Sequence, residues 1–590
     1  MCGIVGGIGN IAYREYLLEG LKKLDYRGYD SAGLSYMKDG EIKTYKVLGK
    51  VSALDQIVPE FEADAGIAHT RWATHGQPSV VNAHPHTSNS GLFTIVHNGV
   101  IENYRAIRNQ LAARKFHFNS ATDTEVIANL LERLYIRCGS VLEALREAEE
   151  ILEGSYACAI LCKERPHRLY FMKKASPLLI GAGQQAYYLA SDAVPMIQFT
   201  NKFVELDDFS YGYVEKEKIR IYKNNEKVEP VFVERNVDQF VYDKGDNEHF
   251  MLKEIKEIPQ ILRSLIDNYF DGKKYTFSPE MIAALRKTKR VHFLACGTSF
   301  YASKMGVRYF RYLGKEAIAS IASEWGYDPY DVSENQIYIL LSQSGETADL
   351  IRCLKVINAR GGISIAVTNS KGSTIDRNST YSILLYCGLE VAVASTKSYL
   401  AQTVAIAMLV GCLERKTKCI VHLDKLIESC HDILNRSDEI RAIAKECTYA
   451  QNAFFVGRTF DYNACLEGAL KLKEITYIHA EAYPGGELKH GPIALIENNT
   501  LVIGFVSDPA VALATRNNFE ELRARNANVV IFSSESVAAK GDKFVVKDVK
   551  PYLTSLGLVM VVQLLTYYIA LEKGLPIDKP RNLAKSVTVE

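Results

Sequence analysis

The sequence lacks a Cys-x-x-Cys pair and the cysteine and histidine spacing of a metal site, although it contains 12 cysteines. Cysteines scattered in this way are typical of buried apolar side chains or inert thiols in a reducing compartment. The first residues, MCGIVGG, also lack the basic and apolar regions of a signal peptide. We therefore expect a cytoplasmic protein that needs no metal or other cofactor.

An excess of one charge is missing too, because 70 Lys and Arg residues are balanced by 69 Asp and Glu residues. Nucleic-acid binding usually leaves a basic excess, so we expect no nucleic-acid partner, and a phosphorylated substrate would need a local anion site. The longest apolar stretch, residues 553–571, is interrupted by Thr554, Ser555, Gln563 and Thr566. We predict a buried helix there and no membrane segment.

The length of 590 residues and the 47% hydrophobic content allow about three to four globular units. Short β-like runs between Gly, Asn and Pro turns, mixed with helices, indicate an α+β domain first. From about residue 290 a strand, a loop and a long helix repeat, which indicates parallel, doubly wound α/β sheets. The predicted segments are a first domain (1–235), a linker with an entering helix (236–289), a first α/β domain (290–415), a connecting helical segment (416–449), a second α/β domain (450–578) and a tail (579–590).

The α/β pattern occurs twice, which predicts a duplicated domain. The run FLACGTSF from Phe293 resembles FFVGRTF from Phe454, with Gly297 opposite Gly457. After its second strand the first copy has LLSQSGET, whereas the second copy has IGFVSDPA. If SQSGET binds a ligand, only the first copy has kept that role.

The SQSGET segment, Ser342 to Thr347, lies between a β run and a long helix. A helix start offers free N–H groups and the positive end of the helix dipole, and Gly345 permits close backbone approach. An ordinary helix cap would explain the same residues. Residues 296–299, CGTS, end the first strand of the same domain, and two polar loops at one sheet edge favour a phosphate site. A nucleotide P-loop is not supported, because the sequence has no GxxxxGK[ST] motif.

Cys2 follows an initiator Met whose removal would leave a thiol nucleophile and a basic α-amine on one residue. Polar companions follow in HTRWATHG (69–76), NAHPH (82–86), HNG (97–99) and TD (122–123). Each companion has a purely structural explanation. Asn98 and Gly99 would suit a hairpin turn. Asp123 would suit a helix start, Arg71 the surface, and the histidines a core or turn position.

Together these segments resemble the glutaminase domain of class II (N-terminal nucleophile) amidotransferases, because MCGIVG, LDYRGYDSAG, HTRWATHG, NAHPH, HNG and TDTE occur in that order. The resemblance implies a four-layer αββα sandwich. It implies that Cys2 attacks the glutamine amide, while the Asn98 side chain and the Gly99 N–H hold the oxyanion. It places Arg71 on the α-carboxylate and Asp123 on the α-ammonium. The implied glutamine site consists of Arg71, Trp72, Thr74, His75 and Asp123.

The second half resembles two SIS (sugar isomerase) domains, so that nearly the whole chain resembles the glutamine–fructose-6-phosphate aminotransferase (isomerizing) family, the glucosamine-6-phosphate synthases. The motifs are ACGTS, SQSGET, VASTKSY, ALKLKEITYIHAEAY, GELKHGP and RNLAKSVTVE. The resemblance implies that fructose 6-phosphate and glutamine give glucosamine 6-phosphate and glutamate, the first step of amino-sugar (UDP-GlcNAc) biosynthesis. It also implies channelled ammonia, with Trp72 as the gate and the 71–79 loop and the tail as lids. We expect a homodimer, because SIS domains commonly share sites between subunits.

By the same resemblance, Lys585 attacks the ketose carbonyl as a Schiff-base amine, Glu474 moves a proton between C1 and C2, and His490 assists ring opening. The sugar-phosphate site consists of Thr298, Ser342, Gln343, Ser344 and Thr347 around the phosphate, with Ser299, Val393 and Ser395 around the sugar. Lys471, three residues before Glu474 on the same helix face, could hold a sugar hydroxyl or tune the carboxylate. Structural explanations exist here too. Glu467, Lys471 and Glu474 would form a solvated ladder of ion pairs on a helix. His490 would be a polar residue of a turn, and Lys585 a solvated residue of the tail.

Two segments depart from the family pattern. SEWGY (323–327) lacks an Arg expected near Gly326, which leaves a helper contact between domains in doubt. YPGG (483–486) has Pro and Gly where Ala is usual, which leaves the stiffness of the His490 loop in doubt.

Other functions lack their motifs or residues. Phosphoribosyl-pyrophosphate amidotransferases and asparagine synthetases need a pyrophosphate loop after an acidic pair, or an SGG-x-DS loop, and neither occurs in the sequence. A fructosamine-phosphate deglycase built on SIS domains has no Cys2 domain. A non-catalytic sugar-phosphate sensor would not need Glu474, His490 and Lys585 together.

Overall fold

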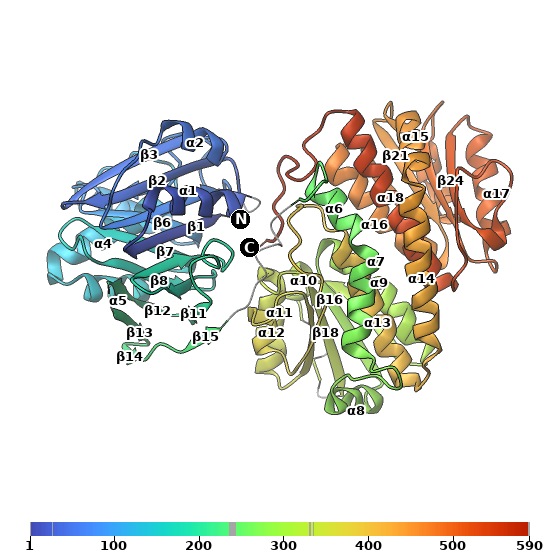
Figure 1. Ribbon diagram of the computed structural model, residues 1–590, viewed down its shortest axis with the longest axis horizontal. Coiled ribbons are helices and arrows are strands. Elements are labelled where there is room, and N and C mark those ends of the chain that lie inside the picture. Colours follow the sequence, from blue (N-terminus) through green and yellow to red (C-terminus); the bar gives the residue numbers. More distant parts are fainter. Residues whose placement is uncertain are drawn as a thin grey trace. The chain divides into compact units, whose positions relative to one another are not determined.

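The computed structural model describes residues 2–25, 28–216, 218–234, 244–329, 332–333 and 335–587. The start of the predicted linker, residues 236–243, lies outside the described residues. The chain divides into two compact units, residues 1–242 with 586–590 and residues 243–585. Each unit has its own sheets (Figure 1). Each unit also has its own hydrophobic cores.

The first unit is built on two sheets whose strands pair in antiparallel fashion. Its strands are β1 (Gly3–Gly9), β2 (Ser31–Lys38), β3 (Glu41–Leu48), β4 (Ala65–Arg71), β5 (His86–Thr87), β6 (Phe93–Ile101), β7 (Gly154–Cys162), β8 (Leu169–Lys174), β9 (Leu179–Ala182), β10 (Ala186–Ala190), β11 (Lys202–Glu205), β12 (Ser210–Glu215), β13 (Lys218–Lys223), β14 (Glu226–Val228) and β15 (Phe232–Glu234). The strand orders are β15-β11-β9-β10-β1-β4-β2-β3 and β14-β13-β12-β8-β7-β6-β5.

Helices cover the outer faces of both sheets. They are α1 (Tyr13–Leu24), α2 (Val51–Ile57), α3 (Tyr104–Ala112), α4 (Thr124–Cys138) and α5 (Val141–Ile151). Because strand side chains alternate between faces, Val5 of β1 joins the core under α1, whereas Ile4 and Ile8 join a core between the sheets. The second sheet contributes Leu161 to that central core, and its other face packs against α4 and α5. This layering confirms the predicted αββα sandwich.

Asn98 and Gly99 lie inside β6, where they pair with Ala157 and Tyr156 of β7. The hairpin-turn explanation of these two residues is therefore wrong. Gly99 has φ of 136°, and a Cβ there would lie 2.0 Å from the carbonyl oxygen of Ser155. Only glycine fits this position, because both the backbone angle and the available space exclude a side chain.

The second unit contains two α/β domains with the same architecture. The first consists of α8 (Pro279–Lys287), β16 (Arg290–Ala295), α9 (Gly297–Tyr312), β17 (Glu316–Ile321), α10 (Ala322–Trp325), β18 (Gln336–Ser342), α11 (Ala348–Ala359), β19 (Ile363–Thr368), α12 (Thr374–Asn378), β20 (Tyr381–Leu384) and α13 (Lys397–Glu414). The second consists of β21 (Asn452–Gly457), α16 (Thr459–Thr476), β22 (His479–Pro484), the 3-10 turns η3 (Glu487–His490) and η4 (Pro492–Leu495), β23 (Leu501–Val506), α17 (Ala512–Arg523), β24 (Asn528–Ser534), η5 (Glu535–Val537), β25 (Phe544–Val546) and α18 (Pro551–Glu572). Helices α6 (Phe250–Lys256) and α7 (Ile258–Tyr269) precede the first domain, and α14 (Lys418–Asn435) and α15 (Ser437–Cys447) connect the two.

Both sheets are parallel and five-stranded, with the matching orders β17-β16-β18-β19-β20 and β22-β21-β23-β24-β25. Neighbouring residues of one strand, such as Phe293 and Leu294 of β16, enter cores on opposite faces of the sheet. Helices therefore cover both faces (Figure 1), as the doubly wound prediction requires. The shared strand order confirms the predicted duplication.

The detailed match between the copies differs from the one predicted. Helix α9 begins at Gly297 with φ of 54°, and α16 begins at Thr459 with φ of 55°. Gly297 therefore corresponds to Thr459 and not to Gly457. Both loops contain Gly and Thr, which made Gly297 and Gly457 look equivalent. In the structure β16 ends two residues before Gly297, whereas β21 ends at Gly457 itself, two residues before Thr459.

Helix α18 confirms the buried helix predicted for residues 553–571. It is long and apolar enough to cross a membrane by length and composition, yet its most apolar window is entirely buried within the fold. The 12 cysteines all lie among the described residues, and all of them are unpaired.

Candidate active sites

Cys2 lies directly before β1, beside the first residues of the loop that follows β4. Its Sγ accepts the backbone N–H of Trp72 at 3.2 Å, and its carbonyl accepts Nδ2 of Asn98 at 2.9 Å. Burial raises the pKa of the Cys2 thiol, while the Trp72 N–H and the Arg71 guanidinium oppose that rise. A nearby base is therefore needed to form the thiolate, which is the role predicted for the α-amine of a processed Cys2.

Arg71 ends β4 and is 3% exposed, so its explanation as a surface charge is wrong. Its Nη2 donates to the carbonyl oxygens of His75 and of Gly76, the latter at 3.0 Å. Its Nη1 is buried and has no hydrogen-bond partner among the described residues. A buried guanidinium with a spare donor can bind an incoming carboxylate, as predicted for glutamine.

Asp123 immediately precedes α4, so the helix-start explanation holds for its position. Its side chain does not cap that helix, however, and Oδ2 instead accepts the backbone N–H of Ile101 at 2.9 Å. Asp123 is thereby tied to the end of β6, the strand that carries Asn98 and Gly99.

Three other predicted glutamine-site residues lie in the loop after β4. Trp72 is half-buried and forms an edge contact with Tyr29 at 6.2 Å between ring centres. Thr74 is exposed, and its Oγ1 lies 3.4 Å from Nδ1 of His75. The structure thus brings Cys2, Trp72 and Asn98 together by direct contacts, whereas Thr74 lies at the surface.

The predicted phosphate loop connects β18 to α11. Ser342 Oγ lies 2.9 Å from Thr347 Oγ1 and accepts the backbone N–H of Gly345 at 3.0 Å. Gly345 has φ of 64°, and a Cβ there would lie 1.9 Å from Ser373 Oγ. Thr347 stands at the N-cap of α11 but makes no side-chain cap hydrogen bond, so an ordinary cap does not account for it.

In the second α/β domain, the loop after β23 corresponds to the predicted phosphate loop but has different contacts. Ser507, the first residue after β23, donates its N–H at 2.7 Å and its O–H at 2.5 Å to the Asp461 carboxylate. Burial raises the pKa of Asp461 to about 6, and the Ser507 donors counteract part of that rise. The second copy therefore has its own anion where the first copy has an open serine-rich loop.

Helix α16 carries Glu467, Lys471 and Glu474 on one face, as the spacing predicts. Lys471 Nζ lies 3.4 Å from Glu467 Oε1 and 2.5 Å from Glu474 Oε2. Glu467 and Lys471 are fully buried, so the solvated-ladder explanation is wrong. Burial raises the pKa of Glu467 to about 8, with Lys471 opposing and Glu474 reinforcing the rise.

Thr298, a predicted phosphate ligand, connects this cluster to the first copy. Its Oγ1 accepts Lys471 Nζ at 3.0 Å and donates to Glu467 Oε1 at 3.3 Å. Ser299, next to it in the first turn of α9, accepts Nε2 of Gln402 at 2.9 Å. The Glu467, Lys471 and Glu474 cluster of the second copy thus touches the edge of the first copy where the predicted phosphate loop lies.

Lys585 is held inside the fold by a carboxylate that sequence reasoning missed. Its Nζ lies 2.5 Å from Glu390 Oε2, which also accepts Ser395 Oγ at 2.8 Å. The solvated-tail explanation of Lys585 is therefore wrong. Val393 N–H donates to the carbonyl of Asp578, the residue directly before the tail, at 3.0 Å. Of the predicted sugar residues, Ser395 therefore contacts the carboxylate that holds Lys585, and Val393 contacts the chain just before the tail.

A second carboxylate, Glu254 of α6, lies in the same buried region and was also missed. Its Oε1 accepts the N–H groups of Val391 and Ala392, at 2.5 and 3.1 Å. Burial, together with the charge of Glu390, raises the pKa of Glu254 to about 8. A lone Glu in LEVAV and another in MLKEIK carry no periodic signal, and only the fold brings them together.

His490 is the predicted catalytic residue that the structure does not join to the others. It ends η3 and is exposed, and its side chain makes no hydrogen bond or ion pair with any described residue. Its preceding loop is constrained by Gly485, where a Cβ would lie 2.4 Å from Asn518 Oδ1. The other segment that departs from the family pattern, residues 323–327, contains Gly326. Next to it, the Arg352 guanidinium stacks on the Tyr327 ring at 4.2 Å.

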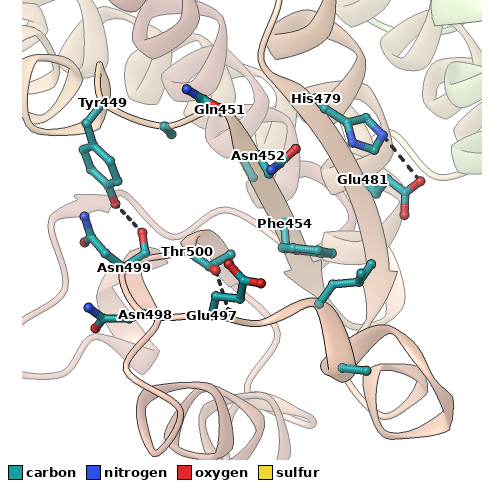
Figure 2. Close-up of a pocket in the computed structure, with 14 residues that line it drawn as sticks. Tyr449, Gln451, Asn452, Phe454, His479, Glu481, Glu497, Asn498, Asn499 and Thr500 are labelled. Carbon is teal, nitrogen blue, oxygen red and sulfur yellow. Dashed lines mark hydrogen bonds and ion pairs between the residues drawn. The ribbon is translucent and has the colours of Figure 1, made fainter.

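A cavity of about 480 Å³ lies at the amino-terminal ends of the strands in the second α/β domain, where β21, β22 and β23 begin. Figure 2 shows His479 facing Glu481, at 3.7 Å, and Tyr449 bonded to the carbonyl of Asn499. Parallel α/β sheets bind ligands at the carboxyl ends of their strands, where the predicted phosphate loop lies. This cavity is therefore separate from the sugar-phosphate residues.

The fold and these residues define a class: an N-terminal-nucleophile amidotransferase domain joined to a pair of SIS domains. Family models agree, since one described as "Glutamine amidotransferase domain" matches residues 69–198 and one described as "SIS domain" matches residues 284–411 and 448–569.

Full-length relatives narrow the class. The glutamine–fructose-6-phosphate aminotransferases (isomerizing) of Geobacillus kaustophilus and Bacillus subtilis are 43% and 41% identical to this chain, and the matches cover all of both chains. The C-terminal domain of glucosamine-fructose-6-phosphate aminotransferase from Francisella tularensis has 30% identity and a TM-score of 0.54, and matches 57% of this chain and all of that domain. The chain belongs to the glutamine–fructose-6-phosphate aminotransferase (isomerizing) family.

Proposed function

We propose that the chain transfers the amide nitrogen of glutamine to fructose 6-phosphate and isomerises the product to glucosamine 6-phosphate. The observation that carries this proposal is the presence, in a member of this family, of a thiol site around Cys2 and a buried Lys585 in the same chain. The reaction would be the first step of amino-sugar (UDP-GlcNAc) biosynthesis in the cytoplasm. The unpaired state of all 12 described cysteines is consistent with that location.

The glutaminase half-reaction begins at Cys2. Its thiolate attacks the glutamine amide carbon, and the tetrahedral oxyanion accepts hydrogen bonds from Asn98 Nδ2 and the Gly99 N–H. Collapse releases ammonia and leaves a glutamyl thioester, which water hydrolyses to glutamate. Arg71 Nη1 binds the α-carboxylate and Asp123 the α-ammonium, while Trp72, Thr74 and His75 enclose the substrate.

The sugar half-reaction begins at Lys585. Its amine attacks C2 of the open-chain ketose and releases water, and ammonia then displaces the lysine to give fructosimine 6-phosphate. Glu474, aided by Lys471, moves a proton from C1 to C2, which yields the amino aldose without an external oxidant or reductant. The 342–347 loop and Thr298 bind the phosphate, and Ser299, Val393 and Ser395 line the sugar.

Two finer statements complete the proposal. Because water protonates free ammonia, direct transfer from one site to the other preserves the nucleophile, with Trp72 as the gate. We also infer a homodimer, since the exposed His490 and the 61% exposed Leu495 lie on one short segment that a second chain could cover.

A mixing assay tests the function. Glutamine and fructose 6-phosphate should give equal amounts of glutamate and glucosamine 6-phosphate without ATP. Cys2→Ala should abolish product formation from glutamine, and product formation that survives in this variant would refute the thiol role.

The two finer statements have their own tests. Trp72→Ala should raise the ratio of glutamate to amino sugar above one. Light scattering of the native protein should give twice the chain mass.

A further inference from the structure

We propose that His69 is a positioning residue of the glutaminase reaction: its Nε2–H fixes the side-chain amide of Asn98 so that the amide N–H group points to Cys2. The inference rests on the proposed function of Asn98 as an oxyanion donor.

The contacts of His69 determine where its hydrogen lies. Nε2 is 3.0 Å from Oδ1 of Asn98 and 3.0 Å from the carbonyl oxygen of His97. A backbone carbonyl can only accept, so Nε2 must carry the hydrogen and donate it to both oxygens. The Asn98 oxygen is then committed to His69, and Nδ2 is left to donate to the Cys2 carbonyl at 2.9 Å.

This matters because an asparagine amide can rotate by half a turn and exchange its oxygen and nitrogen. An Asn98 oxygen turned towards Cys2 would repel the oxyanion that the nitrogen is meant to stabilise. The single donor at His69 Nε2 excludes that orientation, because a rotated amide would place its N–H group against the N–H of His69.

The surroundings keep His69 neutral. Its ring stacks on His84 at 4.0 Å, and His84 meets His86 at 4.8 Å, all three being buried. Burial lowers the pKa of His69 to about 3 and the pKa values of His84 and His86 well below the usual range. A protonated ring would also need an acceptor for Nδ1, which has no partner among the described residues.

A second set of hydrogen bonds fixes His97, the residue whose carbonyl shares the His69 hydrogen. The His97 N–H donates to His84 Nδ1 at 3.3 Å, so His84 carries its hydrogen on Nε2 and donates it to Thr124 Oγ1 at 3.3 Å. The Thr124 hydroxyl is then free to donate to His97 Nδ1 at 2.9 Å, and His97 Nε2 donates to the Ser155 carbonyl at 3.4 Å. Each hydrogen bond in this set has a single donor and a single acceptor that are consistent with the others. The set therefore holds His97, and with it the part of β6 next to Asn98, in place.

The test compares variants of the full-length protein by glutaminase kcat and KM and by melting temperature. His69→Leu removes the donor and should lower kcat about ten- to hundredfold with little change in KM, since loss of an oxyanion donor itself costs about 10²–10³. His69→Gln retains an N–H group at a similar distance and should restore most of kcat. His86→Gln is the matched control, because His86 lies in the same buried cluster but contacts Thr122 Oγ1, and it should keep the wild-type kcat.

The double variant His69→Leu/Asn98→Ala separates the inference from the function on which it rests. If His69 acts through Asn98, the double variant should be no slower than Asn98→Ala. Additive losses, or a kcat drop in His86→Gln equal to that in His69→Leu, would overturn the positioning role. An Asn98→Ala variant with full kcat would instead refute Asn98 as the oxyanion donor.

Discussion

Lys585 Nζ lies 2.5 Å from Glu390 Oε2, and the two side chains are 4% and 0% exposed. Glu390 also accepts the N–H groups of Thr396 and Ser398, at 3.0 and 3.1 Å, just before and within the first turn of α13. The carboxylate therefore ties the tail to the first α/β domain. A lysine held in this way is confined to one place, as a covalent catalyst requires.

Replacing Lys585 should remove covalent capture of the sugar. Borohydride reduction in the presence of fructose 6-phosphate should add one sugar phosphate to the wild-type chain, and Lys585→Ala should lose that adduct while it keeps glutaminase activity. Lys573→Ala, an exposed lysine after α18, serves as the control and should still form the adduct. Intact-protein mass spectrometry reads the result, and an adduct in Lys585→Ala would assign the Schiff base to another lysine.

Replacing Glu390 should change the acid sensitivity of the protein. Burial favours a higher pKa for this group, but Lys585 and the Thr396 N–H outweigh burial and lower the pKa to about 2, from an ordinary value of 4.5. Because the folded pKa is depressed, the stabilisation is present above pH 4.5 and is lost as the pH falls towards 2. The melting temperature of Glu390→Gln should thus lie below that of the wild type at pH 7, with a gap that narrows at pH 3. A gap that widens on acidification would contradict the ion pair.

Replacing Glu467 should have the opposite pH signature. Its folded pKa is raised to about 8, chiefly by burial, whereas the unfolded chain loses the proton near 4.5. The folded state therefore holds an extra proton between these values, and Glu467 makes the protein less stable as the pH rises from 4.5 to 8. The melting temperature of Glu467→Gln relative to the wild type should increase over this range. A difference that does not change with pH would mean that Glu467 is ionised in the fold.

Gly345→Ala should damage phosphate binding selectively. The added Cβ would meet Ser373 Oγ at 1.9 Å in a residue whose φ is 64°, so the 342–347 loop must shift. We expect the KM for fructose 6-phosphate to rise at least about tenfold, equivalent to about 1.4 kcal/mol, with unchanged glutaminase kinetics. Gly361→Ala is the matched control, since its φ of 71° imposes similar strain but its Cβ would meet no atom within 4 Å. Equal effects of the two variants would attribute the loss to backbone strain in general.

The sequence was sufficient for features that depend on periodicity. The strand and helix repeat from residue 290 predicted two parallel sheets, and the long apolar stretch at residues 553–571 predicted the buried α18. The residues of the thiol site were found because six motifs occurred in order. Asn98 shows the limit of local rules, since an Asn-Gly pair is a strong turn signal but here lies within β6, paired with β7.

Contacts across long sequence distances could not be predicted. Glu390 and Lys585 are 195 residues apart, and no spacing rule links a single Glu to a lysine in the tail. The burial of Glu467 and Lys471 also escaped the sequence, because an i, i+4 pair looks the same on a solvated helix and at a domain contact. His69 lies in β4 and Asn98 in β6, which belong to different sheets. Their proximity depends on how the two sheets pack against each other, which residue order alone does not specify.

The Asp461 carboxylate, bonded to Ser507, gives the two α/β domains unequal tasks. A phosphate that approached Ser507 would meet a negative charge and two donors that are already engaged. We therefore expect one sugar-phosphate site in each chain, although the fold is present twice. The second copy, which we expect to bind no phosphate, contributes Glu467, Lys471 and Glu474 instead. Separated from one another, the first copy would recognise the sugar without rearranging it, and the second would have acid–base groups but no substrate.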